Sequence, residues 1–197
     1  MNNLIVIGLA GRARSGKDTV AQHLVHRHGF FRIGLADGVR AAFRDLDGPT
    51  WERTKELDPE IGFSLRWALQ TLGTECRTKV VGARCHWVHH ALIKIAYMAI
   101  HHQEPRHRFV IPDIRFRFEE RELDMRLPTM DGIFRCWMIE RDGAGLAGEL
   151  GNHSSETEIE KIPVSLGIGN HGTIAELREL VDRAVEKVLK PLDPWRD

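Results

Sequence analysis

From Leu4 to Thr19 the chain reads LIVIGLAGRARSGKDT. An apolar run leads into a glycine-rich turn, and a helical pattern follows directly. This order of strand, G-x-x-x-x-G-K turn and helix is typical of a loop that binds nucleotide phosphates. Glycines let backbone N–H groups approach phosphate oxygens, while the helix N-terminus and the lysine add positive charge. We call residues 11–17 the phosphate loop. Its predicted nucleotide contacts are Gly11, Arg14, Ser15, Gly16 and Lys17.

The residue after the lysine departs from the usual motif. A serine or threonine commonly stands there and places its hydroxyl on Mg²⁺. This chain has Asp18 instead, followed by Thr19. Asp18 could bind the metal directly or through water. It could also cap the helix and leave the hydroxyl role to Thr19, and the sequence leaves both interpretations open.

Composition and charge favour one globular domain over residues 1–197. Hydrophobic residues make up 42% of the chain, and Lys+Arg and Asp+Glu number 28 each. A net charge of zero does not suit a protein that covers long stretches of nucleic acid. No apolar run approaches the ~20 residues that span a membrane, and the N-terminal residues lack a signal-peptide pattern. Three widely spaced cysteines fit neither a disulfide framework nor a CxxC site. We therefore expect a cytoplasmic protein without a membrane partner, whose oligomeric state the sequence leaves open.

Apolar runs alternate with helical patterns along the chain. The predicted strands cover residues 4–9, 30–35, 108–112, 132–140 and 164–169. The predicted helices cover residues 17–28, a stretch after 38, 64–79, 86–102, 117–125 and a segment opened by a capping box at Thr173. This alternation predicts an α/β fold, a five-stranded parallel sheet with helices on both faces. Ligands of such sheets bind at the carboxyl ends of the strands.

Two segments are expected to lie over that edge of the sheet. Residues 48–62 are polar and contain two prolines, and with the helices that follow they form a predicted acceptor-side segment of about 48–103. Residues 141–156 contain four glycines and are predicted to form a flexible cover.

Charged residues follow several predicted strands. Asp113 follows an apolar strand, as the second, metal-organising acid of a phosphoryl-transfer site does, although a helix N-cap is the alternative. Asp37 ends the second predicted strand. It would be the general base if the acceptor were a hydroxyl, whereas a phosphate acceptor needs no base; an N-cap is again the alternative. Arg115 and Arg141 could neutralise the transferring phosphoryl group, or Arg115 could lie on a solvated face.

Polar side chains also mark the predicted helix 64–79. Arginine, glutamine and threonine there could bind a phosphate and a base edge, or simply form a polar face. These candidate substrate contacts are Arg66, Gln70, Thr74 and Glu75. His86, His89 and His90 have helical ligand spacing, but only Cys85 adds a possible further ligand, so a solvated or core role is favoured over a metal site.

Several of these stretches together resemble the phage-type deoxynucleoside monophosphate kinases. The matching pieces are Gly11 and Gly16-Lys17-Asp18-Thr19, Leu35-Ala36-Asp37, residues 69–75, Asp113-Ile-Arg115-Phe116 with Glu119, His153-Ser-Ser-Glu156, and Asn170-His-Gly172-Thr173. Their order is that of the family and they span most of the chain. The lysine–aspartate–threonine variant is what this family carries. Arg117-Phe118 stands where the family usually has Pro-Asn.

The resemblance implies a P-loop kinase fold and ATP-dependent, Mg²⁺-assisted phosphorylation of a deoxynucleoside monophosphate. It implies that Lys17 and the phosphate loop hold the donor phosphates, and that Asp18, Thr19 and Asp113 organise the metal. The residues implied to face the acceptor are Asp37, Arg66, Gln70, Thr74 and Glu75. Arg115 and Arg141 would balance charge, and Asn170 to Gly172 would border the adenine.

Two other functions remain open from sequence. One is a kinase of a hydroxyl acceptor, such as a hydroxymethylated base in DNA, which would make DNA a partner. The other is a nucleotide-binding module without catalysis. The base that is accepted cannot be named, because pockets discriminate bases through a few hydrogen bonds whose atoms the sequence does not place.

Overall fold

The computed structural model describes residues 4–47, 71, 85–102, 107–145 and 157–189. The strands are β1 (Leu4–Ala10), β2 (Phe31–Arg32), β3 (His107–Ile114), β4 (Gly132–Glu140) and β5 (Leu166–Gly169). The helices are α1 (Lys17–His28), α2 (Leu35–Asp47), α4 (His86–His101), α5 (Arg117–Arg126) and α7 (Ile174–Leu189). Two short 3-10 helices, η3 (Leu127–Met130) and η5 (Ile159–Lys161), complete the order.

The strands form one five-stranded sheet in the order β2-β3-β1-β4-β5. Every neighbouring pair is parallel. In register, Ala10 at the end of β1 lies beside Ile114 of β3 and Met138 of β4. The carboxyl ends of the three central strands therefore meet at one edge, where the phosphate loop begins. The predicted α/β fold with a parallel sheet is confirmed.

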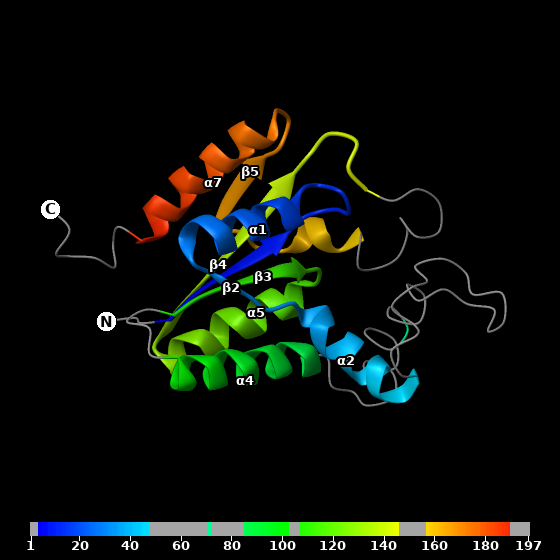
Figure 1. Cartoon of the computed structure of the whole chain (residues 1–197). Helices are drawn as coiled ribbons and strands as arrows, with labels where there is room; N and C mark the ends of the chain where they lie inside the picture. The colour runs from blue at the N-terminus through cyan, green and yellow to red at the C-terminus, as the bar shows by residue number, and fades with distance from the viewer. Residues whose placement is uncertain (1–3, 48–70, 72–84, 103–106, 146–156, 190–197) are drawn as a thin grey trace, which may run out of the picture.

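Helices cover both faces of the sheet (Figure 1): α1 and α7 lie on one face, and α4 and α5 on the other. Strand β1 is buried along its whole length, and its side chains alternate between the two faces. Ile5 and Ile7 join the core under α1 and α7, whereas Val6 joins the core against α4 and α5. The continuous apolar run of β1 follows from this double burial.

Several strand boundaries differ from the sequence prediction, and two of the differences bear on the candidate site. The second strand was predicted to run to residue 35, but β2 ends at Arg32 and α2 begins at Leu35. The backbone turns there because Gly34 donates its N–H to the Asp37 carboxylate (2.8 Å) and accepts the N–H of Asp37 (3.1 Å). The predicted strand 108–112 is in fact β3, 107–114, so Asp113 lies within the strand rather than after it.

Other local predictions are confirmed. Gly29 ends α1 in the left-handed conformation, with φ of 67°. The capping box opens α7: Thr173 donates its N–H to Glu176 (2.7 Å), and Glu176 donates its N–H to the Thr173 hydroxyl (3.2 Å). The predicted helix 64–79 and the polar loop 48–62 lie outside the described residues, apart from residue 71.

Two further expectations concerned the absence of disulfides and of membrane-spanning segments. Cys85 and Cys136 are free thiols, and Cys76 lies outside the described residues. Burial raises the pKa of the Cys136 thiol to about 12, with a smaller contribution from the charge of Glu120. Within the described part of the chain, no helix has both the length and the apolar character to cross a membrane.

Gly8 sits at the centre of β1 where the core leaves no room for a side chain. A Cβ there would lie 2.9 Å from two ring carbons of Phe134 and 3.0 Å from a side-chain carbon of Ile114. We predict that Gly8→Val lowers the free energy of unfolding by about 1–3 kcal/mol through overpacking. Gly167 on β5 is the matched control, because a Cβ there meets nothing within 4 Å.

Chemical denaturation of both variants measures this difference. Gly167→Val should stay within about 0.5 kcal/mol of the parent chain. If both variants lost the same free energy of unfolding, the destabilisation would come from valine in a strand and not from the contact with Phe134.

Candidate active site

The phosphate loop takes a shape that requires glycine at both of its ends. Gly11 has φ of 144° and Gly16 has φ of 105°, a region that residues with a Cβ rarely adopt. Contacts add to this requirement. A Cβ on Gly11 would lie 2.4 Å from the carbonyl oxygen of Ile139, and one on Gly16 would lie 2.5 Å from the side-chain nitrogen of Asn170.

Lys17 closes over its own loop. Its ammonium group donates hydrogen bonds to the carbonyl oxygens of Gly11 and Arg12, each at 2.7 Å. The lysine that follows the second glycine therefore lies at the mouth of the loop. This is where a cation can meet phosphate oxygens held by the backbone N–H groups of the loop and helix.

Asn170 connects the phosphate loop to the ends of β4 and β5. It follows β5 and is buried. Its side-chain N–H donates to the carbonyl of Ser15 (2.9 Å), and its backbone N–H donates to the carbonyl of Glu140 (2.7 Å). The resemblance implied that Asn170 borders the adenine. That role stays a prediction, and the structure shows that the side-chain amide also supports the phosphate loop.

Ser15 offers a test of whether the loop suits an anion. Its hydroxyl oxygen is buried and has no hydrogen-bond partner among the described residues. Buried polar atoms nearly always have a partner, so this hydroxyl marks a place for one. Together with the two glycines, the helix terminus and Lys17, it gives the loop the donors that a phosphate group needs.

Asp18 and Thr19 lie in the first turn of α1, with Asp18 exposed. The N-cap of this helix is Gly16, and no side chain caps it. The alternative that Asp18 caps the helix is therefore wrong. Its carboxylate and the Thr19 hydroxyl are oxygen ligands of the kind that Mg²⁺ prefers, so the residues present are compatible with the metal.

Asp113 holds the N-terminus of α2. Its two carboxylate oxygens accept the backbone N–H groups of Leu35 and Ala36, each at 2.8 Å. Burial raises the pKa of Asp113, the two N–H groups act against that rise, and nearby Asp37 adds to it while Arg115 opposes it. The N-cap alternative is thus present in the structure, and the next residue, Ile114, pairs with Ala10, which precedes the phosphate loop.

Asp37 lies in the first turn of α2, not at the end of a strand. Its carboxylate accepts the N–H of Gly34 and pairs with Arg32 (3.5 Å) and Arg40 (3.3 Å). The side chain is 29% exposed.

Arg115 follows β3 and is positioned by Glu119. The buried Glu119 carboxylate accepts the backbone N–H groups of Arg115 (2.9 Å) and Phe116 (3.1 Å), which fixes the chain where it enters α5. Asp113 and Arg115 at the end of β3 therefore lie near Asp37 in the first turn of α2, and both Asp37 and Arg115 act on the charge of Asp113. Arg66, Gln70, Thr74 and Glu75 lie outside the described residues.

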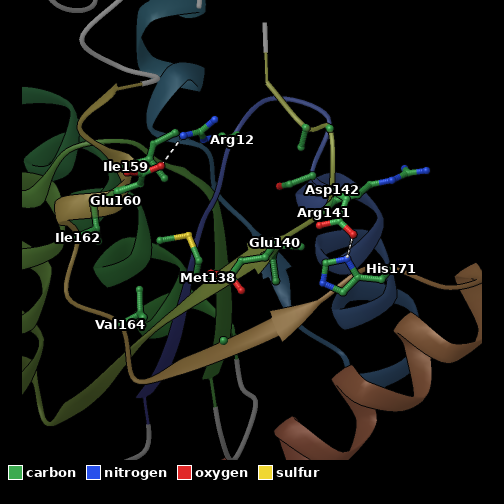
Figure 2. A pocket seen from close by; sticks show the side chains of 15 residues that line it. Arg12, Met138, Glu140, Arg141, Asp142, Ile159, Glu160, Ile162, Val164 and His171 are labelled. Carbon is green, nitrogen blue, oxygen red and sulfur yellow. Dashed lines mark hydrogen bonds and ion pairs between the residues drawn. The ribbon is translucent and has the colours of Figure 1, made fainter.

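A cavity of about 600 Å³ adjoins the phosphate loop at the ends of β4 and β5 (Figure 2). Its charged lining residues are Arg12, Glu140, Arg141, Asp142, Glu160 and His171. Two ion pairs cross its rim, Arg12 with Glu160 and His171 with Asp142 (3.0 Å). The exposed Arg141 lies at this cavity, and Gly145 donates its N–H to the carbonyl of Ala13 (2.8 Å), which holds the segment after β4 against the loop. The rest of the predicted cover, 146–156, lies outside the described residues.

The sequence reasoning did not select Arg12, Asp142, Glu160 or His171 as site residues. Arg12 lies inside the phosphate loop and His171 lies between two selected residues, so their positions were the available signal. The pairings themselves join residues up to 148 positions apart, which no local pattern reveals. Gly172 is exposed, and a Cβ there would come 2.2 Å from a Glu176 oxygen of the capping box of α7. Its predicted place beside the adenine stays a prediction.

Comparisons with known proteins agree with this geometry. The chain is 26% identical over 196 residues to a protein of Acanthamoeba polyphaga mimivirus described as "Putative deoxynucleotide monophosphate kinase". The match covers 93% of this chain and 97% of that protein. The similarity that the motifs indicated is therefore confirmed. No protein-family model matches the chain.

Solved structures show the fold. A gluconokinase from Sinorhizobium meliloti 1021 superposes with a TM-score of 0.53 at 12% identity, over 98% of this chain and 97% of that chain. TT1252 from Thermus thermophilus superposes with a TM-score of 0.52 at 19% identity, over 96% and 98% of the two chains.

The tether between Asn170 and Ser15 gives a direct prediction. Asn170→Ala removes the donor to a buried carbonyl, so we expect the free energy of unfolding to fall by about 1–3 kcal/mol. Nucleotide affinity should fall as well, because the loop loses its support.

Gln22→Ala on α1 is the control, since Gln22 is an exposed amide. Denaturation and ATP titration of both variants make the comparison, and unchanged ATP affinity in a destabilised Asn170→Ala chain would contradict the role in the loop.

Taken together, the sheet order, the phosphate loop and the structural neighbours show a P-loop kinase fold, in a chain similar along almost its whole length to a viral protein named as a kinase.

Proposed function

We propose that the protein is an ATP-dependent kinase that transfers the γ-phosphate to a deoxynucleoside monophosphate. The observation that carries this proposal is the phosphate loop closed by Lys17 at the edge of the sheet where Asp37, Asp113 and Arg115 also gather. The viral relative supports the choice of acceptor through its description.

In the proposed reaction, an oxygen of the acceptor phosphate attacks the γ-phosphorus of ATP. The bond from that phosphorus to the bridging oxygen breaks, and ADP leaves with the electron pair. Lys17 and the N–H groups of the phosphate loop hold the β- and γ-phosphates, so the donor stays in line with the acceptor. The buried Ser15 hydroxyl is a further contact for these phosphates.

Mg²⁺ would be held by Asp18 and Thr19, with Asp113 behind them, and when bound it neutralises charge on the donor phosphates. Because both Asp113 oxygens already accept backbone N–H groups, we propose that Asp113 acts on the metal through water. Its hydrogen bonds to the first residues of α2 then couple the proposed metal site to the start of the acceptor side.

Arg115 and Arg141 are proposed to neutralise the transferring phosphoryl group from two sides. Arg115 is fixed through Glu119, and Arg141 lies at the cavity beside the phosphate loop. The cavity itself is proposed to receive the nucleoside of ATP, with Asn170, His171 and Gly172 at its border. Its volume is within the range of small-molecule sites. Asp37, Arg66, Gln70, Thr74 and Glu75 are proposed to face the acceptor.

The acceptor class is tested with a panel of deoxynucleoside monophosphates, incubated with ATP and Mg²⁺. We expect a diphosphate from at least one of them, and Lys17→Met should reduce kcat/KM by about 100-fold or more because it removes a donor to the transferring group. Lys94→Met changes an exposed lysine on α4 and serves as the control. ATP binding that depends on Lys17 without any product would favour the non-catalytic module instead.

A substitution of Asp37 distinguishes a kinase that phosphorylates a phosphate group from one that phosphorylates a hydroxyl group. Its carboxylate already binds Gly34 and two arginines, which supports a positioning role over that of a base. We therefore expect Asp37→Asn to raise KM for the acceptor while kcat falls by less than about tenfold. Steady-state kinetics with varied acceptor measure both constants. A loss of kcat with KM unchanged, together with turnover of hydroxymethylated DNA, would point to the hydroxyl-acceptor kinase.

A further inference from the structure

Two histidines of α1 meet one carboxylate of α7. The Nε2 atoms of His23 and His28 each lie 2.6 Å from the same oxygen, Oδ1 of Asp182. The two imidazole rings lie edge to face, with centroids 5.6 Å apart. The helices pack side by side on one face of the sheet, so the cluster bridges two elements more than 150 residues apart in sequence.

The cluster has the donor set of a transition-metal site. Its three candidate ligand atoms lie within 4.8 Å of one another, and no other trio of histidine, cysteine or acidic side chains in the described residues does so. Imidazole nitrogens together with one carboxylate oxygen suit zinc and its neighbours, whereas Mg²⁺ prefers oxygen alone.

The surroundings keep these ligands available. The His23 and His28 side chains are 12% and 17% exposed, while Asp182 is 38% exposed. Because the Asp182 side chain is exposed, water can reach its carboxylate and complete a coordination shell.

We propose that His23, His28 and Asp182 bind one divalent transition-metal ion, with Zn²⁺ the best match and water as the fourth ligand. Zinc bonds of about 2.0–2.1 Å in a tetrahedron place ligand atoms roughly 3.3 Å apart. The two 2.6 Å contacts must therefore open by less than about 1 Å. As the ion binds, each Nε2 gives up its proton, and the bound neutral imidazole keeps one proton on Nδ1. The partly exposed Asp182 side chain can make that movement by rotation.

The ion would join α1 to α7 away from the nucleotide. Along a helix that rises 1.5 Å per residue, His23 and His28 lie roughly 9 and 16 Å beyond Lys17. Arg108 of β3 donates to the carbonyl of His28 (3.0 Å), so the end of α1 is already held to the sheet. Zinc would thus clamp the helix that follows the phosphate loop without contacting the phosphates.

The test titrates ZnCl₂ into the tag-free, EDTA-treated full chain by calorimetry, without nucleotide. The parent chain should bind one equivalent at this site. His23→Gln and His28→Gln should each lose that equivalent or bind it roughly tenfold or more weakly. His26→Gln is the matched control, because His26 lies on the same helix and is exposed; it should bind as the parent does.

Thermal unfolding gives a second measurement and a check on folding. At zinc concentrations about a hundredfold above the dissociation constant, the Tm of the parent and of His26→Gln should rise by about 5–10 °C. The Tm of the other two variants should not rise, although circular dichroism shows them folded. Equal binding in all four proteins, or no binding by the parent chain, would overturn the proposal. Because the assay contains no ATP, its outcome is independent of the proposed kinase activity.

Discussion

The parallel pairing of β1 between β3 and β4 is the constraint on which the rest of the structure depends. Because β1 is buried along its whole length, both faces of the sheet must be covered by helices. Because the three strands are in parallel register, their carboxyl ends must lie at one edge. This register brings the phosphate loop, the end of β3 with Asp113 and the end of β4 before Arg141 to the same edge, and the hydrogen bond from Gly145 to Ala13 adds to it.

Much of this arrangement could be predicted from residues 4–19 and from the alternation of apolar runs with helical patterns. β1, α1 and β4 lie close to or at their predicted bounds, because each has a strong local signal. The start of α2 could not be predicted, because it depends on Asp113. This residue lies 78 positions after Leu35, the first residue of the helix. The carboxylate of Asp113 binds N–H groups that would otherwise be free to continue a strand.

The candidate site divides in the same way. The glycines and Lys17 follow from a motif whose spacing has a mechanical reason. The role of Asn170 does not follow from any motif, because an asparagine after a strand does not indicate which loop its side chain supports. The histidines show the point most clearly. The sequence pattern indicates the closely spaced histidines at 86–90. His23 and His28 instead contact the Asp182 carboxylate, and they do so only because α1 packs against α7.

The hydrogen bonds of Lys17 to the carbonyls of Gly11 and Arg12 have a consequence for ligand selectivity. An ammonium group already solvated by its own backbone gives up two good acceptors when a ligand enters. Neutral acceptors on a nucleoside or a sugar offer nothing better in exchange, while anionic phosphate oxygens form stronger, charge-assisted hydrogen bonds. The two carbonyl groups of the loop thus compete for the lysine, and they favour molecules whose oxygens carry negative charge.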